Sequence, residues 1–370
     1  RWTTKLTVPE SGKYGFTFTG DDGFRIFLDD KRLVDHWVEG PPTPITFEIK
    51  LVAGKTYDLR IEYFQAEGGF EAQLNWQPPG KSLYEQALDA AKKSDIAIVC
   101  VSTHRTEGEG GDRPSMDLPV HQADLIRAIA AVNKKTIVVL NNGTPVTMKN
   151  WLNKVPAIVE GWFPGQEGGT ALAAILFGDV NPSGKLPDTL AAGRNDYPDA
   201  NNFPGANHEV NYAEGIYVGY RHFDKDNIQP LFPFGYGLSY TTFDYKNLQL
   251  SKTNLSPDGS VTASVDIINA GKRAGEEVAE LYLHDLQPKI DKPVRELKGF
   301  SKIALQPDEI KIVHFTIHPR DLAYFDAPNH QWKADAGEYE IEIGASSRDI
   351  RQKVILRLNA DFTDKVPLSN

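Results

Sequence analysis

The 370-residue chain has a single cysteine, Cys100, so an internal disulfide and a thiolate metal cluster are excluded. Basic residues are also few, with 40 Lys and Arg against 50 Asp and Glu, a formal net charge of −10. This balance argues against nucleic acid as a partner, because the phosphate backbone binds best to a basic surface. No apolar run approaches the length of a membrane-spanning helix, so we expect no membrane partner.

Residues that build turns and a core are plentiful. The chain contains 31 Gly and 24 Pro, and hydrophobic residues make up 40% of it and charged residues 24%. These fractions are typical of a globular protein, and the length predicts roughly 2–3 domains. A cysteine-poor chain suits either side of a membrane, so composition leaves the compartment open.

Residues 1–80 alternate between apolar and polar side chains with a period of two. Aromatic residues occupy every second position of 14–18, a turn follows at 21–23, and the alternation resumes in 24–28 and 57–63. This pattern is typical of hairpins, so we predict an antiparallel β-sandwich. The first four residues already resemble the interior of a strand, and we therefore expect further chain before them.

The pattern changes in residues 81–190. Continuous apolar runs of strand length alternate with helical patterns; the runs are 95–101, 135–141 and 155–163, and the helical patterns 84–94, 120–133 and 167–179. Strands that are apolar on both faces and alternate with helices indicate a mostly parallel sheet. We predict an α/β sandwich domain here.

The remaining chain returns to short strands after an irregular connection. Residues 191–245 are rich in Asn, Asp, Pro, Gly and aromatics, and 246–370 show short alternating runs spaced as in a fibronectin III-like sandwich. The predicted fold class is therefore multidomain α/β plus β, with an antiparallel β-sandwich, an α/β sandwich and a C-terminal fibronectin III-like β-sandwich.

One loop combines carboxylates with glycines. Residues 106–113 read T-E-G-E-G-G-D-R, which places Glu107, Glu109 and Asp112 shortly after the predicted strand at 95–101. Ligands of open α/β sheets bind outside the carboxyl ends of the strands. A carboxylate there can have a raised pKa and act as a general acid. The residues alone leave a second interpretation open, an acidic surface loop with flexible turns.

The segment TEGEGGDRPSMDLP, followed by HQADLI, resembles the acid/base loop of family 3 glycoside hydrolases. Further segments resemble the same family in the same order: VLNNGTPV, EGWFPGQEGGTALAAILFGDVNPSGKLPDTL, YVGYRHFD and LFPFGYGLSYTTF. The resemblance covers residues 83–245 and continues into the fibronectin-like domain. It implies a retaining β-glycosidase, with β-glucosidase action on terminal non-reducing β-D-glucosyl residues as the first expectation, and no cofactor.

The family's E-G-x-D-R motif falls on residues 109–113 of this sequence and makes Glu109 the general acid/base. Glu107, two residues earlier, is the rival candidate, and Asp112 and Arg113 are interpreted as bracing the loop by ion pairing. The family's nucleophile is an aspartate in an S-D-W-type sequence on an N-terminal (β/α)8 barrel, and no such motif occurs here. The resemblance implies that a barrel domain or chain supplies it and that residues 1–370 are inactive alone.

Residues 1–37 and 51–76 resemble the protective-antigen-type sandwich module, which some family 3 β-glucosidases carry as an insertion that overhangs the pocket. Some adhesins with this module bind Ca²⁺ through paired aspartates. Asp21 and Asp22 lack the companion oxygen ligands that Ca²⁺ needs, so a turn is the favoured interpretation. Exposed aromatics of the module can stack on a sugar, or else pack in the sandwich as half-buried side chains; the candidates are Phe64, Phe70 and Trp76.

Two other functions stay open. A β-xylosidase of the same family is a close alternative, because sugar choice depends mainly on barrel residues. A non-catalytic carbohydrate-binding or adhesion protein would account for two terminal sandwiches without a nucleophile. A metal site at His104, Glu107 and Glu109 is disfavoured, since the nine histidines show no ligand spacing. By analogy with degraders of cellulose and other plant polysaccharides, a periplasmic or secreted location is favoured, and a homo-oligomer is compatible with the sequence.

Overall fold

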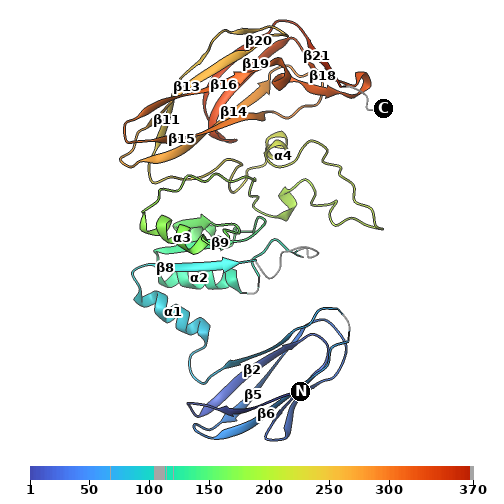
Figure 1. Cartoon of the computed structure of the whole chain (residues 1–370), viewed down its shortest axis with the longest axis vertical. Helices are drawn as coiled ribbons and strands as arrows, with labels where there is room; N and C mark the ends of the chain where they lie inside the picture. Colours follow the sequence, from blue (N-terminus) through green and yellow to red (C-terminus); the bar gives the residue numbers. More distant parts are fainter. Residues whose placement is uncertain (67, 104–112, 114, 120, 367–370) are drawn as a thin grey trace. The chain divides into compact units, whose positions relative to one another are not determined.

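The computed structural model describes residues 1–66, 68–103, 113, 115–119 and 121–366 (Figure 1). The chain forms two compact units, Arg1–Asp95 and Ile96–Asn370, and each is described by itself. Among the described residues, every helix is too short or too polar to cross a membrane.

The first unit is a β-sandwich followed by a helix. One antiparallel sheet has the strand order β1-β6-β3-β4 and the other the order β5-β2-β7. The elements are β1 (Trp2–Thr7), β2 (Gly12–Gly20), β3 (Phe24–Leu28), β4 (Lys31–His36), β5 (Thr43–Leu51), β6 (Thr56–Tyr63), β7 (Ala72–Gln77) and α1 (Leu83–Lys93).

The core of this sandwich follows the period-two pattern of the sequence. Successive side chains of a strand point to opposite faces, so the aromatic residues at alternate positions of β2 all reach the core. Tyr14, Phe16 and Phe18 are buried there, and the ring of Phe18 lies 4.6 Å from that of Phe24 on β3. These contacts between strands of the two sheets confirm the predicted antiparallel sandwich.

The turn between β2 and β3 is stabilised by its second aspartate. Asp22 has a left-handed backbone (φ 65°), and its carboxylate accepts hydrogen bonds from the backbone N–H groups of Gly40 (3.1 Å) and Ala66 (2.6 Å). These contacts are those of a turn residue that ties two loops together.

The second unit begins with a three-stranded parallel sheet of order β10-β9-β8, formed by β8 (Ala97–Ser102), β9 (Thr136–Asn141) and β10 (Ala157–Glu160). Its helices are α2 (Gln122–Val132) and α3 (Gly168–Phe177). Ile126 and Ile129 of α2 are buried, as are Val138 and Leu140 of β9. The predicted alternation of strand and helix is confirmed, and all three strands point their carboxyl ends to the same edge.

The chain ends in a second β-sandwich (Figure 1). A three-stranded sheet, β11-β13-β16, packs on a five-stranded sheet, β12-β20-β19-β14-β15, around a continuous apolar core. The strands are β11 (Phe243–Leu250), β12 (Asn254–Leu255), β13 (Val261–Asn269), β14 (Gly275–Asp285), β15 (Glu296–Leu305), β16 (Ile310–Ile317), β19 (Gly337–Ser346) and β20 (Asp349–Leu358). A small antiparallel sheet adds β17 (Tyr324–Asp326), β18 (Gln331–Ala334) and β21 (Phe362–Lys365).

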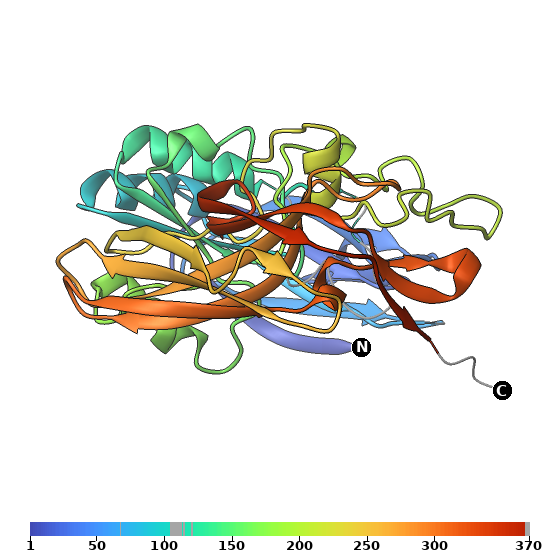
Figure 2. The same ribbon diagram turned by 90° about the horizontal axis from the view of Figure 1, so that it is seen from above.

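An irregular segment connects the parallel sheet to this sandwich and packs against it through charged groups. Its helix α4 (Tyr220–Lys225) carries Asp224, whose Oδ1 lies 2.7 Å from Nε of Arg348. Upstream, Nζ of Lys185 lies 3.2 Å from Oε1 of Glu277 on β14, and both side chains are largely buried. Part of the segment extends as a loop away from the sandwich strands (Figure 2).

These observations confirm the predicted fold class of α/β plus β, with a sandwich at each end of the chain. The parallel sheet is followed by an irregular connection that contains a single described α-helix. The division into domains at residues 80, 190 and 245 stays a prediction.

Candidate functional site

The carboxyl edge of the parallel sheet is where the sequence predicts the site. In the parallel register Ser102 lies beside Asn141, and Glu160 lies beside Leu140. The last residues of all three strands therefore meet at one edge, the place where α/β sheets bind ligands. Glu107, Glu109 and Asp112 belong to the loop after β8 and lie outside the described residues.

The end of β8 is held by the first residue of α2. The side-chain amide of Gln122 accepts a hydrogen bond from the Ser102 N–H (2.8 Å) and donates one to the Ser102 carbonyl (2.9 Å). These two hydrogen bonds replace those that a neighbouring strand would make with the Ser102 backbone, so β8 stays extended up to its last residue. The sequence predicted a helical pattern over 120–133; the contact of Gln122 with the strand appears only in the structure.

Arg113 ties the downstream end of the loop to the same edge. Its Nη2 donates to Oγ1 of Thr144 and to the carbonyl of Pro145, both at 2.7 Å, in the turn that follows β9. Further along, the Thr147 N–H donates to the Met116 carbonyl (2.9 Å). The guanidinium therefore braces the end of the E-G-x-D-R motif beside the sheet, through the turn after β9.

The ends of β9 and β10 approach each other closely. The Gly161 N–H donates to the Leu140 carbonyl (2.8 Å), and a Cβ on Gly161 would lie 3.1 Å from that carbonyl oxygen. Glycine therefore suits this position because it lets the backbones meet. Beyond it, Trp162 has a left-handed backbone (φ 50°), and its N–H donates to Oε1 of Glu160 (3.1 Å).

A groove of about 490 Å³ opens at this edge. Thr144, Trp162 and Phe163 line one part of it, and Asp188 lines another. Phe163 is 53% exposed, so the groove presents an aromatic surface to solvent. Burial raises the pKa of Asp188, against the effect of a hydrogen bond from the Thr189 N–H. An aromatic surface beside a carboxylate suits a polar ligand that has apolar faces, such as a sugar.

Two roles were predicted for Phe64, Phe70 and Trp76 of the first unit, packing in the sandwich or stacking on a sugar. Trp76 stacks on the buried Tyr14, with ring centroids 5.3 Å apart, and Phe64 packs on Trp37 at 4.8 Å. These two are packing residues of the sandwich. Phe70 is 88% exposed and presents its ring to solvent most fully, while Trp76, although stacked on Tyr14, is itself 45% exposed.

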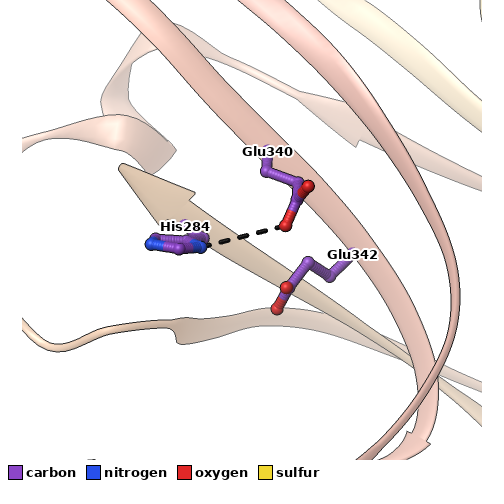
Figure 3. Close-up of side chains that lie close together, drawn as sticks. All are labelled: His284, Glu340 and Glu342. Carbon is purple, nitrogen blue, oxygen red and sulfur yellow. Dashed lines mark ion pairs between the residues drawn. The ribbon is translucent and has the colours of Figure 1, made fainter. Parts of the chain in front are cut away.

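A cluster that resembles a metal site lies elsewhere, in the C-terminal sandwich. His284, Glu340 and Glu342 bring their side chains together (Figure 3). Nζ of Lys353 lies 2.7 Å from Oε2 of Glu340 and 2.8 Å from Oε1 of Glu342. Burial acts to raise the pKa of Glu340, but the hydrogen bond from Lys353 holds it below its usual value. Arg295 adds a second cation, with its Nε 3.3 Å from Oε2 of Glu342. The two cations balance the charge of the two carboxylates, so the cluster is an ion-pair network.

Two functional candidates escaped the sequence analysis. Asp188 follows a Lys-Leu-Pro segment that looks like an ordinary turn, and Glu214 lies in an irregular stretch without a recognisable pattern. Both line hollows of the second unit. No local signal distinguishes them, because the hollows are formed by residues that meet only in the folded chain.

Comparisons with known proteins agree with the geometry. The model of the glycosyl hydrolase family 3 C-terminal domain matches residues 37–240, and that of the fibronectin type III-like domain matches residues 277–347. The chain is 39% identical over 382 residues to a beta-glucosidase of Rhizobium radiobacter, covering 98% of this chain and 46% of the relative. It is 43% identical over 281 residues to thermostable beta-glucosidase B of Acetivibrio thermocellus, covering 76% of this chain and 37% of that protein.

A solved structure extends the likeness to three dimensions. The beta-glucosidase of Kluyveromyces marxianus in complex with glucose superposes with a TM-score of 0.83 at 34% identity, covering 98% of this chain and 44% of that one. The chain thus spans less than half the length of these relatives. Since the model of the family's C-terminal domain matches more than half of its residues, the chain belongs to glycosyl hydrolase family 3.

Proposed function

We propose that this chain is the C-terminal part of a retaining β-glucosidase that removes terminal non-reducing β-D-glucosyl residues, and that Glu109 is its general acid/base. The contact of Arg113 with the turn after β9 carries the proposal, because it anchors the end of the E-G-x-D-R motif at the ligand-binding edge of the sheet. The relatives named beta-glucosidases support the reaction class.

In the proposed mechanism an aspartate outside this chain, on a (β/α)8 barrel, attacks the anomeric carbon. Glu109 protonates the departing glycosidic oxygen, and a covalent glycosyl-enzyme forms. Glu109 then takes a proton from water, which attacks the same carbon and releases the sugar with retained configuration. Retaining enzymes hold the two carboxyl groups about 5–5.5 Å apart, so the barrel must dock against the carboxyl edge of the sheet. Residues 1–370 alone would be inactive, and hydrolysis needs no cofactor.

We assign the first sandwich to the protective-antigen-type module, inserted in the α/β domain. Two face-to-face antiparallel sheets and the aspartate-anchored turn between β2 and β3 support this. The proposed domains are residues 1–80 for the module, 81–190 for the α/β sandwich, 191–245 for the connection and 246–370 for the fibronectin III-like domain.

A different sugar is the second candidate within the same reaction class. One relative, 36% identical over 303 residues, is named an exo-alpha-(1->6)-L-arabinopyranosidase of Bifidobacterium breve. Specificity for the cleaved sugar therefore varies among relatives at this identity, and a pentosidase such as a β-xylosidase is the alternative to test beside the glucosidase.

The test compares the complete enzyme with its Glu109→Ala and Glu107→Ala variants on aryl β-glucosides and aryl β-xylosides. We expect Glu109→Ala to lower the rate about 10²–10⁴-fold on poor leaving groups. For leaving groups that need no protonation, formation of the glycosyl-enzyme should stay nearly as fast as before, but its hydrolysis should be slow because the general base is missing. Added azide should then release the sugar as β-glucosyl azide. Glu107→Ala is the matched control, with the same charge removed two residues away.

Each outcome decides between the candidates. Full activity of Glu109→Ala together with loss in Glu107→Ala would transfer the acid/base role to Glu107. Faster hydrolysis of the aryl β-xyloside than of the aryl β-glucoside would assign the enzyme as a β-xylosidase. A complete enzyme that hydrolyses neither glycoside would favour a non-catalytic carbohydrate-binding protein.

A further inference from the structure

A second hollow lies beside the groove, in the irregular segment. It has a volume of about 290 Å³ and is formed by residues of 188–219 alone. Its lining includes three acids, which are Asp188, Asp199 and Glu214, together with Asn202, Asn211 and the exposed rings of Phe203 and Tyr212. The loop that carries most of them extends away from the sandwich strands (Figure 2). The family resemblance assigned no role to this hollow.

Two of these acids, Asp188 and Glu214, have acceptor oxygens that the described chain does not fill. Asp188 accepts a hydrogen bond from the Thr189 N–H (2.7 Å), and no charged group among the described residues shifts its pKa, which burial raises. Oε2 of Glu214 is buried, and no described residue donates a hydrogen bond to it. The Glu214 oxygen is withdrawn from water without a donor. This costs free energy, which a ligand with hydroxyl donors would offset.

The third acid at the hollow, Asp199, differs from these two because both of its carboxylate oxygens accept hydrogen bonds. Nη1 and Nη2 of Arg194 each donate to one oxygen of Asp199, both at 2.9 Å. This two-pronged pairing fills both oxygens of Asp199 and neutralises its charge. The unfilled oxygens of Asp188 and Glu214 are therefore a local feature of those two residues.

Aromatic and amide side chains complete the lining. Tyr212 is 82% exposed and Phe203 is 48% exposed, so both rings offer apolar faces to solvent. The amides of Asn202 and Asn211 can each donate and accept hydrogen bonds. Rings that cover apolar C–H faces, with carboxylates and amides for hydroxyl groups, match the chemistry of a saccharide.

The hollow adjoins the candidate active site through one residue. Asp188 lines the hollow on one side and, on the other, the groove that contains Trp162 and Phe163. A saccharide long enough to extend out of the groove would meet Asp188 first and Tyr212 and Glu214 beyond it.

We propose that the hollow lined by Asp188, Tyr212 and Glu214 is a saccharide-binding subsite that holds a neutral hexose unit of an oligosaccharide. The ring of Tyr212 stacks on the sugar, and the two carboxylates accept hydrogen bonds from its hydroxyl groups. This inference rests on the proposed glycosidase function for the choice of β-glucosides as ligands. A divalent cation is disfavoured, because in the described chain the only three-member group with converging ligand atoms lies at His284.

Binding is tested first on the full 370-residue chain, which needs no catalysis. Cellobiose and cellotriose are titrated by calorimetry and by saturation-transfer NMR. We expect Tyr212→Ala to weaken binding about three- to tenfold through the lost stacking. Glu214→Gln should weaken it about fivefold, because a charged acceptor is replaced by a neutral one. The matched controls, Asp258→Asn and Tyr84→Ala, remove an exposed charge and an exposed ring elsewhere and should bind like the unmodified chain.

The second arm uses the complete enzyme. Tyr212→Ala should raise KM for cellotriose while leaving kcat and the hydrolysis of a small aryl β-glucoside unchanged. If the unmodified complete enzyme does not hydrolyse the aryl β-glucoside, the proposed function is refuted, but saccharide binding by the chain is not. An unmodified chain that binds neither saccharide, or Tyr212→Ala and Glu214→Gln variants that bind like it, would overturn the subsite. An unchanged KM of Tyr212→Ala for cellotriose would also overturn it. So would a chain that binds Ca²⁺ but no saccharide and loses Ca²⁺ binding in the Glu214→Gln variant.

Discussion

The carboxyl group of Glu280 permits a quantitative prediction about stability and pH. Glu280 lies on β14, is 3% exposed, and faces the turn at Gly235 of the connecting segment. Burial raises its pKa to about 7, although the hydroxyl of Tyr282 and the charge of Lys185 both act to lower it. In the unfolded chain the same group has an ordinary pKa of 4.5.

The sign and size of the effect follow from linkage. A carboxyl group whose pKa is raised by folding stabilises the folded state while it is protonated, and this contribution is lost as pH rises through the folded pKa. The pKa of about 7 lies roughly 2.5 above 4.5, and each unit of pKa is worth about 1.36 kcal/mol. Between pH 4 and pH 8 the unmodified protein should therefore lose about 3 kcal/mol of unfolding free energy at this residue.

Glu280→Gln removes the titration and keeps the shape. The free energy of unfolding of the variant relative to the unmodified chain should rise by about 3 kcal/mol from pH 4 to pH 8. Urea titrations at each pH, followed by hydrogen exchange in peptides from β14 and β19, report on this sandwich alone. Glu276→Gln is the control on the same strand, because hydrogen bonds from Lys302 and Ser183 lower the pKa of Glu276. Its effect on stability should have the opposite dependence on pH.

A flat difference between Glu280→Gln and the unmodified chain over this pH range would refute the reasoning. It would mean that water or a counter-charge reaches the Glu280 carboxylate and keeps its pKa near the ordinary value.

Three further changes test the packing around the connecting segment and the sheet. Gly235→Ala should destabilise the chain by at least about 1–2 kcal/mol in a thermal melt, because φ is +82° and the new Cβ would lie 2.3 Å from Oε1 of Glu280. Lys185→Met should cost about 3 kcal/mol in urea denaturation, since it leaves the largely buried Glu277 without its cation. Gln122→Leu should cost about 1–3 kcal/mol and abolish hydrogen-exchange protection at the last amide of β8, whose partner is lost.

Each of these has a decisive counter-result. A Gly235→Ala variant that melts with the unmodified chain would show that the turn relaxes freely. Replacing Glu277 by Gln in the Lys185→Met background should recover part of the loss, and no recovery would argue against charge burial as the cause. Continued protection of the β8 amide in Gln122→Leu would show that another group replaces the amide.

Local patterns in the sequence predicted the elements of this protein because they depend on neighbours in the chain. Alternating aromatics in 14–18 and apolar runs such as 135–141 specify strands through the period of a strand and its burial. The helical patterns at 84–94 and 120–133 likewise predicted the helices that the structure places at Leu83–Lys93 and Gln122–Val132. The resemblance carried the acid/base assignment to Glu109, which remains a proposal.

Contacts between distant segments were decided by tertiary structure alone. The sequence determined two terminal sandwiches, a parallel sheet and a carboxylate-rich loop after the first strand of that sheet. The folded chain decided that Arg113 reaches the turn after β9, that Glu280 is buried against Gly235, and that Asp188 and Glu214 share a hollow. Burial and missing hydrogen-bond donors set the chemistry of these acids, and both depend on which remote residues pack around them.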